Sequence, residues 1–423
     1  MKKFYIMLLL LCIFAASCST GPVAEESSLS SSDSSVKEES DEAQSTDKDV
    51  QNKFNFLASE MCETSDAVYG LSEKNFVVFF DKASKTSGIL CGRPECMHDD
   101  SSCNASVDAL AQGLTVYANK LYWIGQEHYQ NKVSELYLWC MNLDGTNLQK
   151  LKKLDKELWS VVKGNTFVEI HRENIYVAGI IGVVNQGQPS ETVMVYAESV
   201  EDETAEPVIV FEKKFSNEPT PNVRIMPIGD QVYIMLSYSN GDGTCGLELY
   251  VWNSKTSELT TLYEEKRESF YAWEMWVEEG DGIYMSSFSI ESIGADVPAG
   301  AYKYDFAANE ISQCFEIRDG EKFYTIANIG DDIVFITGRD EDNNRKLFVM
   351  NFDGVIIYNE KLDIPELMDG KVYGAIPYGG DNESIYMLFS GSDDYIMQAY
   401  MIQIPLSEDA EPIIMWKEER KIN

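Results

Sequence analysis

The sequence contains few basic residues and very little histidine. Its 34 Lys and Arg stand against 70 Asp and Glu, which gives a net charge of −36, and it has only 3 His. Phosphate backbones are bound by clustered Lys and Arg, so this charge balance argues against a nucleic-acid partner.

Familiar catalytic motifs are missing as well. The chain has no Gly-x-Ser-x-Gly, no phosphate-binding loop, no dinucleotide-binding glycine pattern and no His-Glu-x-x-His. Residues 340–344 echo a calcium loop, but Arg345 stands where that loop needs glycine. We therefore assign no catalytic residue, and the sequence does not favour an enzyme.

Only the N-terminus is strongly apolar. Lys2 and Lys3 precede an apolar run of 11 residues, Phe4 to Phe14, which is too short for a bilayer that needs about 20 helical residues. A basic start, a short apolar run and small residues are typical of a secretory signal. We interpret residues 1–17 as a signal peptide.

The residues that follow the apolar run are Ala15, Ala16, Ser17 and Cys18. They resemble the lipobox of bacterial lipoproteins, although Ala15 stands where that family usually has Leu. The resemblance implies that the Cys18 thiol carries acyl chains such as palmitate and becomes the first residue after cleavage. A plain secretory signal is the alternative. Two acyl chains anchor a protein stably, so we expect the chain on the extracytoplasmic face of the cell membrane.

Residues 18–52 are predicted to form a tether. From residue 19 on they contain ten serines and nine acidic residues against two basic ones, and no aromatic residue. Such a stretch cannot bury enough apolar surface to offset its chain entropy, and like charges extend it. Residues 53–423 then form the single folded domain.

A short strand with an aromatic or β-branched centre recurs along this domain. Its copies begin at Leu121, Ile175, Val232, Ile283, Ile333 and Ile385, each after a polar turn, at spacings of 54, 57, 51, 50 and 52 residues. A second hairpin follows each copy, and a further unit spans residues 77–90. Four-stranded repeats near this length indicate an all-β β-propeller.

We favour seven four-stranded blades; six and eight are the alternatives, because the first unit is short. A β-sandwich rarely sustains such a period, and the repeat of a β-helix is much shorter. Residues 53–60 would close the ring by pairing with the last strand near residues 413–416. Most aromatic residues are expected to fill the gaps between blades.

The hairpin Asn142-Leu143-Asp144-Gly145-Thr146 and the strand Leu121-Tyr122-Trp123 resemble β-propellers of the low-density-lipoprotein-receptor-related type. The sequence motifs of this type are clear in this one repeat only. The whole arrangement resembles uncharacterised lipoproteins of Gram-positive-type bacteria, in which a Cys-rich stretch often follows the first unit. The resemblance implies a fold and a location but no activity.

The Cys-rich stretch here contains Cys91, Cys96, His98 and Cys103, and Cys62 lies in the same unit. Paired cysteines outside the membrane usually form disulfides, so two bridges that staple a loop are the first interpretation. Three Cys and one His are also a legitimate tetrahedral zinc set, although the C-x4-C-x-H-x4-C spacing matches no standard finger. Free thiols are the third interpretation. All three roles are mainly structural.

Three functions remain for the domain. The favoured one is a binding module that holds a protein, peptide or glycan on its loops, with cationic partners preferred by an acidic surface. Residues 185–192, 239–246, 288–299 and 338–346 are the expected loops. A hydrolase or lyase acting on extracellular polysaccharide through carboxylates in the central channel is the second. A structural subunit of a cell-envelope complex, recognisable by an exposed apolar patch, is the third.

Overall fold

The computed structural model describes residues 60–72, 74–99, 101–108, 111–126, 135–154, 166–185, 188–202, 204–216, 221–240, 244–268, 270–287, 300–316, 323–329, 332–339, 345–351, 355–361, 371–380, 383–392, 396–407 and 410–421. The expected signal peptide and tether, and with them Cys18, lie outside these residues. So do the predicted loop 288–299 and the calcium-loop echo at 340–344. No helix long and apolar enough to cross a membrane occurs in the described part of the chain.

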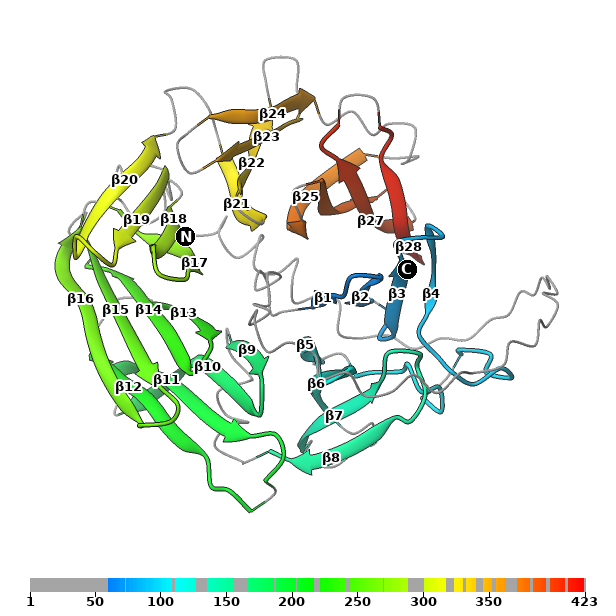
Figure 1. Ribbon diagram of the computed structural model, residues 1–423, viewed down its shortest axis with the longest axis horizontal. Coiled ribbons are helices and arrows are strands. Elements are labelled where there is room, and N and C mark those ends of the chain that lie inside the picture. The colour runs from blue at the N-terminus through cyan, green and yellow to red at the C-terminus, as the bar shows by residue number, and fades with distance from the viewer. Residues whose placement is uncertain are drawn as a thin grey trace. The chain divides into compact units, whose positions relative to one another are not determined.

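The described strands form seven antiparallel sheets of four strands each, and every sheet is built from consecutive strands. The sheets follow one another around a central axis as the blades of a β-propeller (Figure 1). The predicted all-β propeller is thus confirmed, with seven blades rather than six or eight.

Each blade has a first, second, third and fourth strand, counted from the centre of the ring to its rim. The strands of each kind are given below in the order of blades 1 to 7. The first strands, which adjoin one another at the centre, are β1 (Met61–Glu63), β5 (Gln112–Tyr117), β9 (Thr166–His171), β13 (Pro221–Ile228), β17 (Ala272–Glu278), β21 (Phe323–Ile329) and β25 (Lys371–Gly380). The second strands are β2 (Ala67–Leu71), β6 (Lys120–Gln126), β10 (Asn174–Asn185), β14 (Gln231–Ser239), β18 (Gly282–Ser287), β22 (Asp332–Arg339) and β26 (Ser384–Ser392). The third strands are β3 (Val77–Asp81), β7 (Leu136–Asn142), β11 (Gln188–Ser199), β15 (Cys245–Asn253), β19 (Gly300–Asp305), β23 (Arg345–Asn351) and β27 (Ile396–Pro405). The fourth strands, at the rim, are β4 (Thr86–Ile89), β8 (Gln149–Lys153), β12 (Val208–Ser216), β16 (Glu258–Glu268), β20 (Glu310–Glu316), β24 (Ile356–Lys361) and β28 (Ile413–Lys421) (Figure 1).

The recurring segments of the sequence are the second strands of blades 2 to 7. A second strand is hydrogen-bonded along both edges, and both of its faces pack on neighbouring blades, so most of its residues are apolar on both faces. Ile175, Ile234 and Ile283 are fully buried. This double burial explains why a short run of apolar and aromatic residues returns at each period.

The short first unit is a complete four-stranded blade, in which β1, β2, β3 and β4 have only 3, 5, 5 and 4 residues. One expectation needs correction. Residues 185–192 are not a long loop. Strands β10 and β11 stay paired from Asn174↔Ser199 to Asn185↔Gln188, so these polar residues extend a hairpin.

The hydrophobic core lies between the blades rather than within any one of them. One buried cluster joins blades 3 and 4, where the rings of Tyr176 and Trp252 meet edge to face with centroids 6.3 Å apart. Another joins blades 4 and 5 and reaches Phe348 of blade 6. Large rings fill the wedge between radiating sheets, as the aromatic content predicts.

A buried ion pair crosses the joint between blades 4 and 5. The Arg224 guanidinium on β13 donates to both carboxylate oxygens of Glu274 on β17, with Nη2···Oε1 2.8 Å and Nε···Oε2 3.0 Å. The same guanidinium lies 3.9 Å from the ring centroid of Phe167 on β9. Arg224 therefore contacts three successive blades. A second buried pair, Lys152 with Glu198 at 2.7 Å, joins blades 2 and 3.

The ring closes where blade 7 meets blade 1. Met61, Phe80, Tyr386 and Met415 are part of one buried cluster across this joint, and the Tyr378 hydroxyl donates to Glu60 at 3.1 Å. Strand β28 pairs with β27 among the described residues. The pairing expected between residues 53–60 and the last strand concerns residues that, except for Glu60, lie outside those described.

The Arg224–Glu274 pair supplies a test of inter-blade stability. We expect Arg224→Met to lower the free energy of unfolding by about 3–5 kcal/mol, because it leaves the Glu274 carboxylate buried and unpaired. Lys255→Met is the control, since Lys255 pairs with Asp230 at 2.5 Å but is 72% exposed, and an exposed pair contributes about 1 kcal/mol or less. Urea unfolding of both variants measures the difference, and equal losses would contradict the interpretation.

Candidate metal centre

The Cys-rich segment joins the last strand of blade 1 to the first strand of blade 2. It runs from Leu90, after β4, to Ala111, before β5. Backbone hydrogen bonds hold it against blade 1: Leu90 N donates to Val77 O at 2.9 Å, and Val77 N donates to Ala105 O at 2.8 Å. The buried side chains of Leu90, Cys103, Ala105 and Val107 join the core cluster of blades 1 and 2.

The same segment also contacts the turn between β7 and β8. Gly92 N donates to Gly145 O at 3.0 Å, and the Asn104 side-chain amide donates to the same oxygen at 3.4 Å. Gly145 has φ +76°, and a β-carbon there would lie 2.6 Å from Leu90 O. Two backbones therefore approach each other more closely than side chains would allow.

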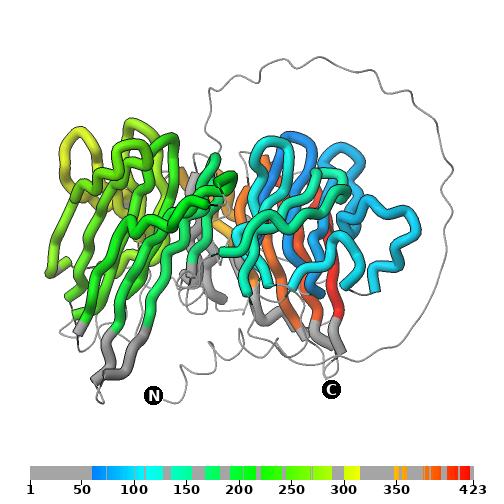
Figure 2. The backbone as a smooth tube through the Cα atoms, turned by 90° about the horizontal axis from the view of Figure 1, so that it is seen from below, coloured from blue at the N-terminus to red at the C-terminus, as the bar shows by residue number. Residues whose placement is uncertain are grey.

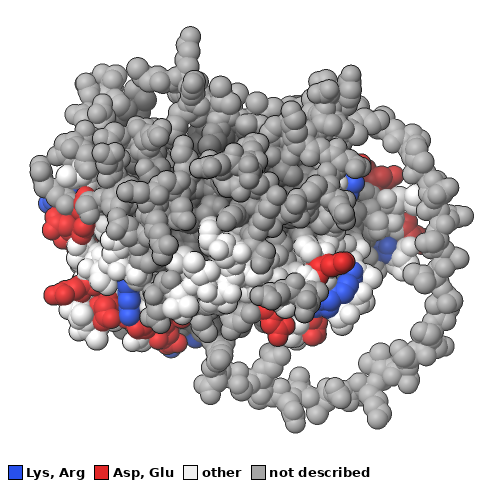
Figure 3. Space-filling view, turned by 90° about the horizontal axis from the view of Figure 1, so that it is seen from above, with Lys and Arg blue, Asp and Glu red and all other residues white. Residues whose placement is uncertain are grey.

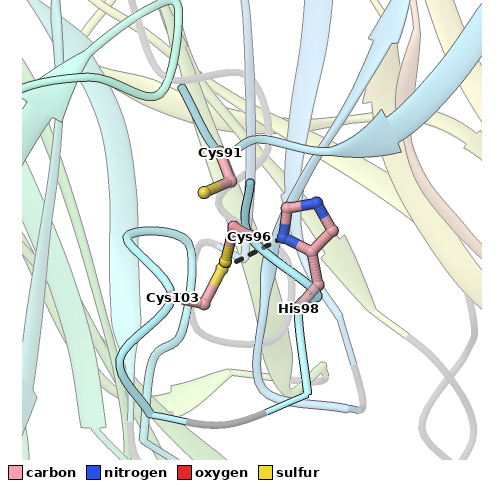
Figure 4. Close-up of side chains that lie close together, drawn as sticks. All are labelled: Cys91, Cys96, His98 and Cys103. Atoms are coloured by element: carbon pink, nitrogen blue, oxygen red, sulfur yellow. Dashed lines mark hydrogen bonds between the residues drawn. The ribbon is translucent and has the colours of Figure 1, made fainter. Parts of the chain in front are cut away.

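Four side chains of the segment point toward one another (Figure 4). The ligand atoms of Cys91, Cys96, His98 and Cys103 all lie within 4.8 Å of one another. His98 Nδ1 lies 3.3 Å from Cys103 Sγ. Cys103 is buried, and the other three residues are half-buried.

Cys62 occupies a different place from the other candidates. It is buried in the core cluster of blades 1 and 2, and its sulfur is not one of the four converging atoms. Burial, with a smaller contribution from Glu63, raises the pKa of its thiol well above the ordinary value. No disulfide joins Cys91, Cys96 or Cys103 in this structure.

The local chain conformation places Cys96 and His98 on one side. Cys96 N donates to Arg93 O at 3.1 Å and closes a turn at Pro94 and Glu95. Met97, between them, is 81% exposed, so its two neighbours point inward. His98 has φ 55°, a left-handed conformation that costs a residue with a β-carbon free energy. Surrounding structure must impose such a conformation.

The thiols at the centre of the cluster differ in acidity. At Cys91, burial raises the pKa of the thiol, but hydrogen bonds from the backbone of Arg93 and Asn104 and from the neighbouring thiols outweigh it and lower that pKa. At Cys103, burial raises the pKa to about 12, and the neighbouring sulfurs add to the increase. Cys91 is therefore the first of the two to carry a thiolate.

The sequence did not reveal three residues that shape this site. Gly92 and Gly145 provide the close contact with blade 2, and Arg93 Nη1 donates to Ser102 O at 2.5 Å across the segment. The only available signal was the Asp144-Gly145 turn, which is sharp in one repeat alone. Its contact with a segment more than 40 residues earlier in the chain cannot be read from local patterns.

A small pocket of about 70 Å³ lies beside the segment, with Trp123, Trp139 and Asp108 in its wall. A typical site for a drug-sized ligand has about 300–1,000 Å³, whereas one water molecule fills about 30 Å³. This pocket therefore has room for a few waters.

No known family model matches the chain, and no curated protein matches its sequence. Among solved structures, a prolyl endopeptidase is similar with a TM-score of 0.52 and 12% identity over 88% of this chain and 51% of that protein. An oligogalacturonate lyase from Vibrio parahaemolyticus has a TM-score of 0.47, with 12% identity over 82% of this chain and 88% of that one. The β-propeller domain of the Trilobed protease from Pyrococcus furiosus has a TM-score of 0.43 and 10% identity, over 85% and 96% of the two chains. The chain spans about half the length of the prolyl endopeptidase, and at this identity the likeness concerns the fold alone.

The contact between the segment and blade 2 can be tested at Gly145. Gly145 and Gly280 have nearly the same φ, 76° and 77°, but a β-carbon at Gly280 would meet nothing within 4 Å. Both Ala variants carry the backbone cost of a left-handed alanine. Gly145→Ala should lose roughly 1–3 kcal/mol more unfolding free energy than Gly280→Ala, because it adds a clash with the Leu90 carbonyl. Urea unfolding measures the unfolding free energy of both variants. Equal losses would mean that the close contact between Gly145 and Leu90 does not stabilise the protein.

Proposed function

We propose that the chain is a binding module held at the extracytoplasmic face of the cell membrane by lipid on Cys18. The propeller binds a ligand on its loops, and residues 18–52 keep it away from the bilayer. The proposal for the ligand-binding role is carried by one observation: seven blades packed into a ring provide a rigid scaffold for exposed loops.

The geometry of the ring supports a binding role for the loops. The described strands cross the thickness of the ring (Figure 2), so the described turns that join them lie at its two faces. Buried ion pairs and inter-blade clusters fix neighbouring blades against each other. Loops on a rigid scaffold lose little conformational entropy when they bind, which is why binding sites concentrate there.

The charge of the chain supports cationic ligands. With a net charge of −36, the protein attracts positive groups and repels polyanions. In the view of Figure 3, the red of Asp and Glu covers more of the described surface than the blue of Lys and Arg. A basic peptide, a basic protein surface or a glycan bridged by cations has the chemistry that this surface would accept.

The exposed apolar side chains are distributed along the rim. Apart from Met97, the large ones among the described residues lie on or next to fourth strands: Val208, Ile209, Leu259, Val355, Ile356 and Ile357. They belong to three blades, 3, 4 and 6. Exposed apolar residues in small groups are normal on a soluble domain, so we favour the loops over the rim as the binding surface.

Anchoring predicts a simple change in location. In a bacterium that processes lipoproteins, we expect the full chain to label with palmitate and to partition with membranes, because two acyl chains anchor stably. Cys18→Ser should abolish labelling and release the chain into the soluble fraction. Cys12→Ser, inside the expected signal peptide, is the matched control and should behave as the wild type. A Cys18→Ser chain that stays in the membrane would contradict the anchor.

Ligand charge gives a second test, on the full chain carrying Cys18→Ser. We expect a Lys/Ser peptide to bind more tightly than a Glu/Ser peptide of equal length. The affinity should fall between about 0.1 and 1 M salt, where the Debye length shortens from about 10 to 3 Å. Fluorescence anisotropy measures both peptides. Tighter binding of the acidic peptide, or binding insensitive to salt, would contradict an electrostatic binding surface.

A further inference from the structure

The Cys-rich segment has the dimensions of a tetrahedral metal site. Zinc binds thiolates at roughly 2.3 Å, so the edge of a Cys tetrahedron is about 3.8 Å. The four ligand atoms already lie within 4.8 Å of one another. A contraction of about 1 Å at the longest edge, which side-chain rotation supplies, is enough to close such a site around one ion.

The composition of the cluster favours an ion over a disulfide. A disulfide joins two sulfurs, so three converging thiols would leave one unused. The fourth sulfur of this region, in Cys62, is not part of the cluster. A disulfide also has no use for the imidazole of His98, which is held in a left-handed conformation 3.3 Å from Cys103 Sγ. A four-coordinate ion uses all four groups.

The surroundings of the sulfurs point the same way. The backbone that carries the sulfurs is held by hydrogen bonds: Cys96 N donates to Arg93 O at 3.1 Å, and Ser106 N donates to Cys103 O at 3.0 Å. Hydrogen bonds around a metal site fix the orientation of the ligand side chains. The exposed Met97 between Cys96 and His98 leaves both ligands facing the same point.

We propose that Cys91, Cys96, His98 and Cys103 bind one Zn²⁺ ion. Three thiolates and an imidazole are soft donors that suit zinc, and four protein ligands leave no position for a substrate. The ion is therefore structural. It fixes the turn that presses Gly92 against Gly145 and so fastens the segment to blade 2. This role is independent of the ligand and of the membrane anchor proposed above.

The direct test is the metal content of the full chain carrying Cys18→Ser, purified without chelators. We expect about one zinc per chain, measured by inductively coupled plasma mass spectrometry. After chelation under reducing conditions, Co²⁺ should bind with visible d–d bands and a thiolate-to-cobalt charge-transfer band, which report tetrahedral sulfur ligation.

Variants of single residues test whether the zinc is bound by this cluster or by cysteines elsewhere in the chain. Cys96→Ser and His98→Ala should lose at least about nine-tenths of the zinc, because a structural site needs all four ligands. Cys140→Ser removes a buried thiol on β7 of blade 2, outside the cluster, and should keep the metal. His98→Cys retains four ligands, so it should keep zinc and strengthen the charge-transfer band. This variant stays informative even if Cys96→Ser fails to fold.

Three results would overturn the proposal. One is a metal-free chain whose intact mass falls about 2 Da short for each bridge, which would establish disulfides instead. Another is a chain with titratable thiols that binds neither zinc nor cobalt. The third is zinc that remains in Cys96→Ser and His98→Ala, because the ion would then lie elsewhere.

Discussion

A four-stranded sheet with two apolar faces cannot be stable alone, and this constraint governs the whole domain. Each blade is buried only when a neighbour covers each of its faces, so the stable unit is the closed ring. The fully buried Ile residues of the second strands and the ring–ring contacts between blades follow from this requirement. The bidentate contact of Arg224 with Glu274 also follows, because a charge at an inter-blade joint is tolerated only with a fully paired partner.

Blade 1 covers its neighbours with unusually short strands. Its strands have 3, 5, 5 and 4 residues, whereas β10 and β11 in blade 3 have 12 each. The Cys-rich segment adds Leu90, Cys103, Ala105 and Val107 to the core at this joint. A small core is commonly reinforced by a disulfide or a metal ion. The segment thus lies beside the blade with the shortest strands, where additional contacts stabilise the ring most. This explains its position between blades 1 and 2.

Much of this fold could be predicted from the sequence, and the limits have physical causes. Doubly buried second strands carry a periodic run of apolar and aromatic residues, so the blade count followed from their spacing. The first strand of blade 1, Met61–Glu63, is too short to carry a pattern. Residues 185–192 are polar and resemble a loop, yet cross-strand pairing extends them as strands. At the site, spacing identified the four candidate residues but could not decide their chemistry. That depends on the left-handed backbone at His98 and on the core position of Cys62, which tertiary packing sets.

In the proposed zinc-bound form, the Cys-rich segment and the β7–β8 turn move as one unit held by the ion. Hydrogen exchange of the full chain carrying Cys18→Ser, measured with zinc and after chelation, shows whether the ion couples them. Exchange reports local opening, so removing the ion should raise exchange in peptides covering residues 90–108 and 140–148 together. Peptides from β18 and β19 in blade 5 should not change. A change confined to residues 90–108, or no change at all, would contradict the account.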